Sequence, residues 1–175
     1  MHRAIVMTVI GPDRPGLVEL LSQIVADHGG NWLESRMSRL GGQFAGILRV
    51  EIPAENENRM SAALQNLQAK GLNVLLQKDE AKAADSDRAS ALLELVGSDR
   101  PGIVREISRA LASKNINVEE LQTEICSAPM SGEMLFKATA ELHLPESCSM
   151  DDVRKELEKI AQDLFVDISI RPVTS

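Results

Sequence analysis

The tetrapeptide Asp-Arg-Pro-Gly occurs twice in this chain, at residues 13–16 and 99–102, each time between an apolar run and a stretch of helical periodicity. Proline fits the start of a helix because the N–H that it lacks would have no partner there, and glycine lets a backbone or a ligand approach closely. Free N–H groups at a helix start, aided by the helix dipole, can hold a small carboxylate such as that of an amino acid. Asp13 and Asp99 could then meet the ammonium group of the same ligand.

A structural interpretation of these two loops is also available from the residues alone. The aspartates can accept hydrogen bonds from the first N–H groups of each helix, and proline and glycine are ordinary residues of tight turns. The repetition of the motif shows only that the two copies share an origin. The residues of the two loops are therefore compatible with both interpretations.

Asn31 and Asn117 stand where the next strand of each copy is expected to begin, which we expect to be close to the same loop. A side-chain amide can donate to a carboxylate and accept from an ammonium group, so these residues are candidates for the same ligand. The alternative is an asparagine that occupies a turn because it tolerates a left-handed backbone.

Composition and motif content disfavour several other classes of protein. The net charge of −7 and the aromatic content of 2% argue against binding to nucleic acid, which needs clustered positive charge or base-stacking rings. Cys126, Cys148 and the three histidines show no metal-ligand spacing, and no catalytic constellation is visible, so we expect no metal, no cofactor and no enzyme activity. Free thiols and the absence of a long apolar run favour a cytoplasmic protein that does not enter a membrane.

An internal repeat organises the whole chain. Gly11 and Gly97 are 86 positions apart, and the same offset pairs Asn31 with Asn117. Further along, the offset becomes 92 and pairs Phe44 with Phe136, which indicates six extra residues in a loop of the second copy. Copies of this length are too long for the units of a solenoid and are typical of duplicated domains.

Hydrophobic periodicity predicts the same element order in both copies. Strands are expected over 3–10, 32–40, 73–78, 89–96, 118–126, 134–144 and 166–171, and helices are indicated by the apolar positions that begin at Leu17, Met60, Ile103 and Val153. Each copy is then βαββαβ, which predicts an α+β fold of two tandem ferredoxin-like domains with antiparallel sheets. The expected boundaries are 1–80 and 89–175, with a polar linker over 81–88.

These features resemble the ACT domain family. The resemblance is carried by the repeated βαββαβ order, by Asp-Arg-Pro-Gly followed by Leu17-Val18 or Ile103-Val104, and by an asparagine that opens each second strand. It covers residues 1–173. ACT domains with similar loops also occur beside catalytic domains, but no residues remain here to build one.

The resemblance implies amino-acid-responsive regulation without catalysis, with ligands at the interface between paired domains, near the first loop and the second strand. Transferred position by position, it gives two candidate binding sites. The first consists of Asp13, Arg14, Pro15, Gly16, Leu17 and Asn31, and the second of Asp99, Arg100, Pro101, Gly102, Ile103 and Asn117.

A chain made only of two such domains further resembles ACT proteins that repress glycine-cleavage and one-carbon genes. The resemblance implies glycine as the effector and action through a protein partner such as a DNA-binding activator, without direct contact to DNA. A homodimer is also expected. The alternative is a stand-alone ACT regulatory subunit that binds and modulates a metabolic enzyme.

Overall fold

The computed structural model describes residues 1–79, 89–129 and 131–173, so the expected linker over 81–88 lies outside the described residues. The chain divides into two compact units, and the division falls within that segment. Within the described residues, no helix is both long and apolar enough to cross a membrane.

The first unit contains four strands and two α-helices. In chain order they are β1 (His2–Pro12), α1 (Leu17–Asp27), β2 (Asn31–Leu40), β3 (Gln43–Pro53), the short 3-10 helix η1 (Ala54–Asn56), α2 (Glu57–Gln65), the 3-10 helix η2 (Asn66–Lys70) and β4 (Asn73–Lys78). The second unit follows the same plan with β5 (Ser90–Ser98), α3 (Ile103–Ser113), β6 (Asn117–Ser127), β7 (Met134–His143), α4 (Met150–Leu164) and β8 (Val166–Pro172).

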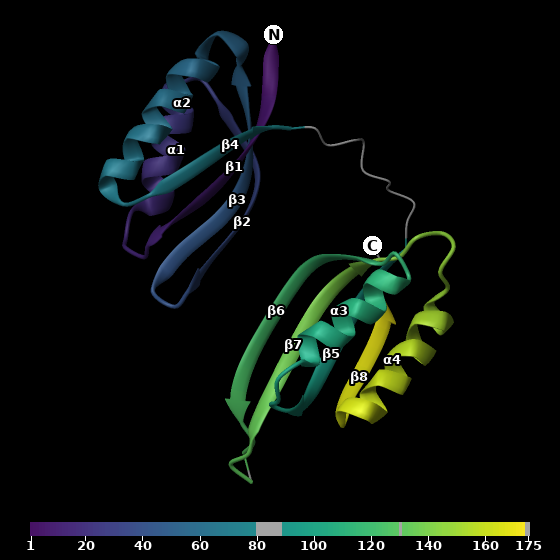
Figure 1. Cartoon of the computed structure of the whole chain (residues 1–175). Coiled ribbons are helices and arrows are strands. Elements are labelled where there is room, and N and C mark those ends of the chain that lie inside the picture. The colour runs from purple at the N-terminus through teal and green to yellow at the C-terminus, as the bar shows by residue number, and fades with distance from the viewer. Residues whose placement is uncertain (80–88, 130, 174–175) are drawn as a thin grey trace. The chain divides into compact units, whose positions relative to one another are not determined.

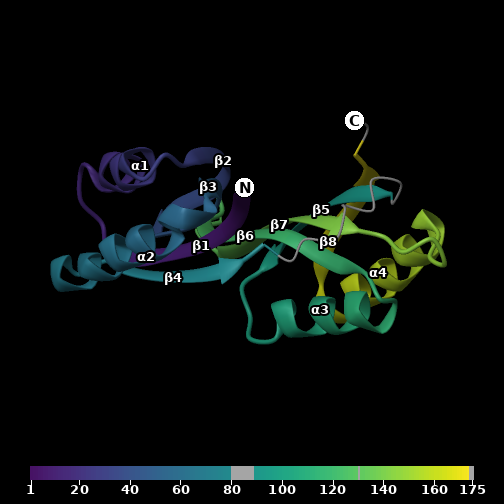
Figure 2. The ribbon, with the colours of Figure 1, turned by 90° about the horizontal axis from the view of Figure 1, so that it is seen from above.

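Each unit is a four-stranded antiparallel sheet with both helices on one face (Figure 1). The strand order is β2-β3-β1-β4 in the first unit and β6-β7-β5-β8 in the second, so the first strand of each copy is central and the second is an edge. Figure 2 shows α3 and α4 together on the same side of their sheet. This is the ferredoxin-like arrangement, and the α+β fold predicted from the periodicity is confirmed.

The core of each unit lies between the helices and one face of its sheet. Along β1, Ile5, Met7 and Val9 are buried, while the alternate residues Thr8 and Ile10 are exposed on the other face. The alternation follows from the two-residue period of a strand. The apolar run over 3–10 therefore belongs to a central strand, but within its unit helices cover only one of its two faces.

The turns agree with the turn residues of the sequence. Gly41 and Gly42 both have positive φ angles, of 58° and 76°, and form the two-residue turn between β2 and β3. Such angles favour glycine in tight hairpins. The corresponding connection of the second unit, between Ser127 and Met134, is longer, as the change of offset predicts.

Helix α4 is the one helix of the described residues whose N-cap side chain makes a capping hydrogen bond. The Ser149 hydroxyl oxygen accepts from the Asp152 N–H at 3.2 Å, and the hydroxyl donates to the Asp152 carboxylate at 2.6 Å. The hydroxyl contact lowers the pKa of Asp152 below its ordinary value. The carboxylate also suits the positive end of the helix dipole.

Replacing Ser149 with alanine is expected to destabilise the second unit by roughly 0.5–2 kcal/mol, the usual loss for an N-cap serine. The pKa of Asp152 is lower in the folded state than in the unfolded state, so its charged form stabilises the fold at pH values above the unfolded pKa. This stabilisation is lost as the pH falls through the folded pKa. The difference in stability between wild type and Ser149→Ala should therefore narrow in acid. Urea titrations at pH 7 and pH 3 measure it, and a difference that widens at pH 3 would contradict the assignment.

Candidate ligand site at the first strand–helix loops

Each Asp-Arg-Pro-Gly loop begins where the first strand of its copy leaves the sheet. The Asp13 N–H donates to the Gly42 carbonyl at 2.9 Å, and the Asp99 N–H donates to the Met134 carbonyl at 2.9 Å. These hydrogen bonds extend the pairing of β1 with β3 and of β5 with β7 by one residue. The loops are therefore fixed to the same sheet end as the β2–β3 and β6–β7 connections.

The helices begin two residues after the prolines, not at the prolines themselves. Gly16 and Gly102 are the N-caps, with φ angles of 87° and 99°, and α1 and α3 begin at Leu17 and Ile103. A β-carbon on either glycine would meet no atom closer than 3.9 Å. The left-handed backbone therefore requires these glycines, and no other segment of the described residues approaches them closely.

The structural alternative, in which the two aspartates cap the helices, is wrong. Neither α1 nor α3 has a side-chain hydrogen bond at its cap. The Asp13 carboxylate instead lies 2.8 Å from the guanidinium of Arg39, near the end of β2. For the Asp99 carboxylate, the described part of the chain offers no ion pair or hydrogen bond.

The two arginines of the loops point to the turn between the second helix and the last strand of their own unit. The Arg14 guanidinium donates to the Lys70 carbonyl at 3.0 Å, and the Arg100 guanidinium lies 5.5 Å from the centre of the Phe165 ring. Both contacts are exposed, and both fasten the loop to a neighbouring turn. Each arginine side chain therefore has a contact within its own unit, and no ligand is needed to explain its position.

The remaining loop residues divide by exposure. Pro15 and Pro101 are exposed, whereas Leu17 and Ile103 are 3% and 2% exposed and belong to the cores of their units. The two buried residues can offer a ligand only their backbone N–H groups, which have no partner within the helix at that position.

The expectation that Asn31 lies close to the loop is wrong within one unit. Asn31 pairs with Glu51, which in turn pairs with Ala4, whereas the loop follows Pro12. Eight residues of β1 separate these two positions, roughly 26 Å along the strand. The connection through α1 returns the chain to the opposite end of the sheet, so β2 begins far from the loop.

The second unit repeats this separation. Asn117 pairs with His143, which pairs with Ser90 at the start of β5, while the loop follows Ser98 at its end. Each candidate set of six residues is therefore brought together only in part. Five residues lie at one end of the sheet and the asparagine lies at the other.

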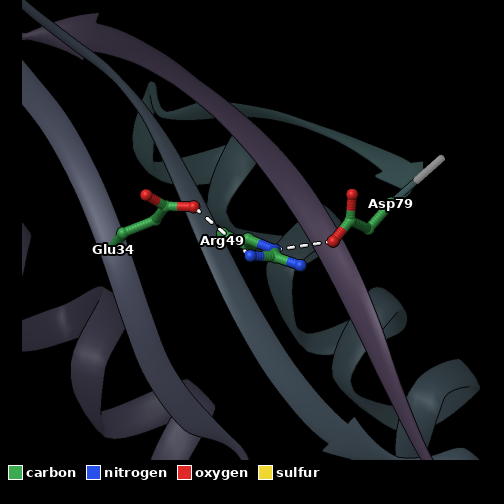
Figure 3. A network of polar contacts seen from close by, with 3 residues as sticks. All are labelled: Glu34, Arg49 and Asp79. Atoms are coloured by element: carbon green, nitrogen blue, oxygen red, sulfur yellow. Dashed lines mark hydrogen bonds and ion pairs between the residues drawn. The ribbon is translucent and has the colours of Figure 1, made fainter. Parts of the chain in front are cut away.

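A polar network on the open face of the first sheet has no counterpart in the sequence motifs. Figure 3 shows the Arg49 guanidinium between two carboxylates: Nε lies 2.6 Å from the Asp79 oxygen and Nη1 lies 3.5 Å from the Glu34 oxygen. The Asp79 side chain is only 7% exposed, and its hydrogen bond is the main cause that raises the pKa of Arg49 above its ordinary value.

This network crosses the sheet. Arg49 stands on β3, opposite Glu34 on β2 and Val6 on β1, and it reaches across β1 to Asp79 beyond the end of β4. The three residues line a hollow of about 280 Å³ together with Arg36 and Ile47. Alternation along β2 and β3 predicts which of these side chains share a face, but only the strand order shows that Asp79 is within reach.

Metal chemistry finds no support in the described parts of the chain. Over residues 1–79, 89–129 and 131–173, no group of three or more His, Cys, Asp or Glu side chains is placed to hold a metal ion. Cys126 and Cys148 are free thiols of intermediate exposure. The two loops present backbone N–H groups at the helix starts and the exposed carboxylates of Asp13 and Asp99.

Two ferredoxin-like units in tandem, each with a helix N-terminus presented by an Asp-Arg-Pro-Gly loop, define the class of this protein. The family model of the ACT domain matches residues 3–77. The first unit is therefore an ACT domain. The second unit repeats the fold and the loop of the first.

Relatives are found over the whole length as well as for single domains. The chain is 23% identical to the glycine cleavage system transcriptional repressor of Escherichia coli, over 97% of this chain and 90% of that protein. It is 33% identical to a UPF0237 protein of Methanopyrus kandleri, over 46% of this chain and 84% of that protein.

Two solved structures share the complete fold. A protein of unknown function from Galdieria sulphuraria has a TM-score of 0.85 and 29% identity, with 99% of this chain and 100% of that chain covered. A second structure, provisionally designated a glycine cleavage system transcriptional repressor, has a TM-score of 0.74 and 18% identity, with 100% and 99% covered. The second shows likeness of fold alone.

Proposed function

We propose that this protein is an amino-acid-sensing regulator that represses glycine-cleavage and one-carbon genes through a protein partner, with glycine as its effector. The observation that carries the proposal is the likeness to the E. coli repressor, which extends over 97% of this chain and 90% of that protein and so includes both ACT domains. A match of this extent favours a shared role for the whole chain more than a match of one domain would.

The loops present groups that can bind both charges of an amino acid. The first N–H groups of α1 and α3 have no partner within their helices, and the helix dipole favours a carboxylate there. Asp13 and Asp99 are exposed at the same loops and carry the charge that an ammonium group requires. Glycine has both groups and no side chain to accommodate.

Asn31 and Asn117 can contribute to a loop site only if that site also includes a second ACT domain. Because Asn31 and its loop lie at opposite ends of one sheet, a ligand that touches both must lie where another domain presents its asparagine. A second copy of the chain can do this in a homodimer. A loop variant and an asparagine variant would then weaken the same site.

The two loops should differ in strength because their aspartates differ in pairing. Arg39 neutralises Asp13 at 2.8 Å, and the position that corresponds to Arg39 in the second copy is Ile125. Within the described residues, no arginine competes with an ammonium group for the Asp99 carboxylate. We propose that the second loop holds glycine more tightly than the first.

Calorimetric titration of the full chain with glycine tests these assignments. Asp99→Ala should lower the affinity on the order of ten- to a hundredfold, because a charge-assisted hydrogen bond contributes roughly 1.5–3 kcal/mol. Asp13→Ala should have a smaller effect, and Arg39→Ala should strengthen the first site. Gly16→Val is a poorer probe, since it strains the left-handed backbone at that position.

Asp27→Ala is the matched control, because Asp27 is an exposed aspartate at the other end of α1. It should leave the glycine affinity unchanged. If none of the twenty amino acids binds to the wild-type chain, the sensing role is refuted. If glycine binds and Asp99→Ala binds it equally well, the loop assignment is refuted while sensing stands.

Action through a protein partner predicts that the isolated chain does not recognise an operator. The net charge of −7 opposes contact with phosphates, and every α-helix of the described residues packs on a sheet as part of a βαββαβ unit. Fluorescence anisotropy at physiological salt should show no sequence-dependent affinity below micromolar. A sharp, sequence-dependent titration would show that the protein binds DNA directly.

A further inference from the structure

The second unit contains an apolar cavity of about 140 Å³ between α3 and its sheet. Its walls are aliphatic side chains from α3, β5, β6 and β7, together with the ring of Phe136. Among the described residues that line it, Ser108 is the only polar one and none is charged. Such a lining gives a water molecule too few polar partners to replace its hydrogen bonds in bulk water.

Comparison of the two copies explains the cavity. The offset of 86 places Val118 where the first unit has Trp32, and the offset of 92 places Ala140 where it has Leu48. The registers agree, because Trp32 pairs with Val50 on β3 and Val118 pairs with the corresponding Leu142 on β7. Trp32 packs against the core of the first unit, and Leu48 is 1% exposed there.

At two other positions the second unit has the larger side chain, but neither of these side chains fills the cavity. Leu121 stands at the position of Ser35, but it is 48% exposed and lies at the rim. Ala138 replaces Gly46 and adds only a methyl group. The volume that an indole ring occupies in the first unit is therefore left unfilled in the second.

The cavity is accessible from solvent along the edge of the sheet. Val104 on α3 and Val118 and Leu121 on β6 are 43%, 37% and 48% exposed, and all three line the cavity. Strand β6 is an edge strand, so no further strand of the same sheet covers this side. A small molecule can enter between α3 and β6 without unfolding the unit.

We propose that this cavity binds a small uncharged hydrophobic molecule with a planar ring of about the size of indole. The size argument comes from Trp32, whose side chain occupies the corresponding space of the first unit. A dry cavity of about 150 Å³ with a similar lining is large enough for a benzene ring. A zwitterion would have to give up hydration of both charges to enter, so this site is separate from the one proposed for glycine.

The test is a titration of the full chain with indole, followed by carbon-13 methyl spectra. Shifts should saturate and be confined to methyl groups that line the cavity, such as those of Ile107, Leu111 and Val118. Glycine added at saturation should leave them unchanged. Shifts that spread over both units or fail to saturate would overturn the proposal.

Filling variants make the test specific. Val118→Trp restores the residue of the first copy and should abolish the saturable shifts. Its matched control is Val96→Trp, since Val96 lies in the same unit at 36% exposure but on the open face of the sheet. The control should bind indole as the wild type does. Ala140→Leu, which fills the cavity from β7, provides a second variant if Val118→Trp does not fold.

A second copy of the chain is the competing occupant. If the lining methyl groups shift with protein concentration in the absence of indole, and sedimentation shows a dimer over the same range, a side chain of the second copy fills the cavity. That outcome would overturn binding of a free molecule. Loss of glycine binding would bear on the proposed function alone, because the two titrations report on different residues.

Discussion

Leu21→Ala is expected to destabilise the first unit by about 2–5 kcal/mol, the range for removal of a fully buried leucine side chain. Leu21 lies in the middle of α1, is 0% exposed and packs in the core cluster of that unit. The close-packed interior relaxes only partly around the missing atoms, which adds the free energy of a cavity to that of transfer. The helix that presents the Asp-Arg-Pro-Gly loop would be the element most affected.

Fluorescence of Trp32 during urea unfolding measures this effect in the full chain. Trp32 is the single tryptophan of the sequence and packs against the core of the first unit, so its signal follows that unit. Val18→Ala is the control, because Val18 lies on the same helix at 48% exposure and its loss should change stability by at most about 0.5 kcal/mol. Equal effects of the two variants would show that α1 is not anchored through Leu21.

Gly11→Ala is the second large effect, with an expected loss of about 1–3 kcal/mol or more. A β-carbon on Gly11 would lie 2.6 Å from the Gly71 carbonyl oxygen and 3.2 Å from the Leu72 Cα atom. Both are backbone atoms, which cannot move aside as the end of a flexible side chain can. Gly11 lies directly before Pro12 and the Asp-Arg-Pro-Gly loop. Displacement of the backbone at Gly11 should therefore also lower the affinity of that loop for a ligand.

The control for Gly11→Ala is Gly102→Ala, which tests a glycine of the other kind. The space around Gly102 is open, but its φ angle of 99° is unfavourable for alanine, at roughly 1–2 kcal/mol. Trp32 fluorescence should detect Gly11→Ala and be unaffected by Gly102→Ala, which lies in the second unit. A Gly11→Ala protein with wild-type stability would show that β1 and the η2–β4 turn can separate without penalty.

Local patterns in the sequence account for most of the fold. The helical spacing that begins at Leu17, the two glycines of the β2–β3 turn and the alternation along 134–144 each depend on neighbouring residues, and each is present in the structure. Because the second copy repeats the first, both have the element order βαββαβ, and that order predicts the fold class. Backbone angles are harder to predict from local sequence. Gly16 has a left-handed backbone, so α1 begins at Leu17 and not at Pro15.

By itself, therefore, the sequence determined the two copies, their element order, the fold class and the loops that could bind an amino acid. Only the tertiary structure decided which side chains meet. It places Asn31 at the far end of the sheet, pairs Asp13 with Arg39, brings Asp79 to Arg49 across β1, and leaves a cavity where Val118 replaces Trp32. These outcomes depend on strand order, register and volume, which join residues distant in sequence and leave no local pattern to read.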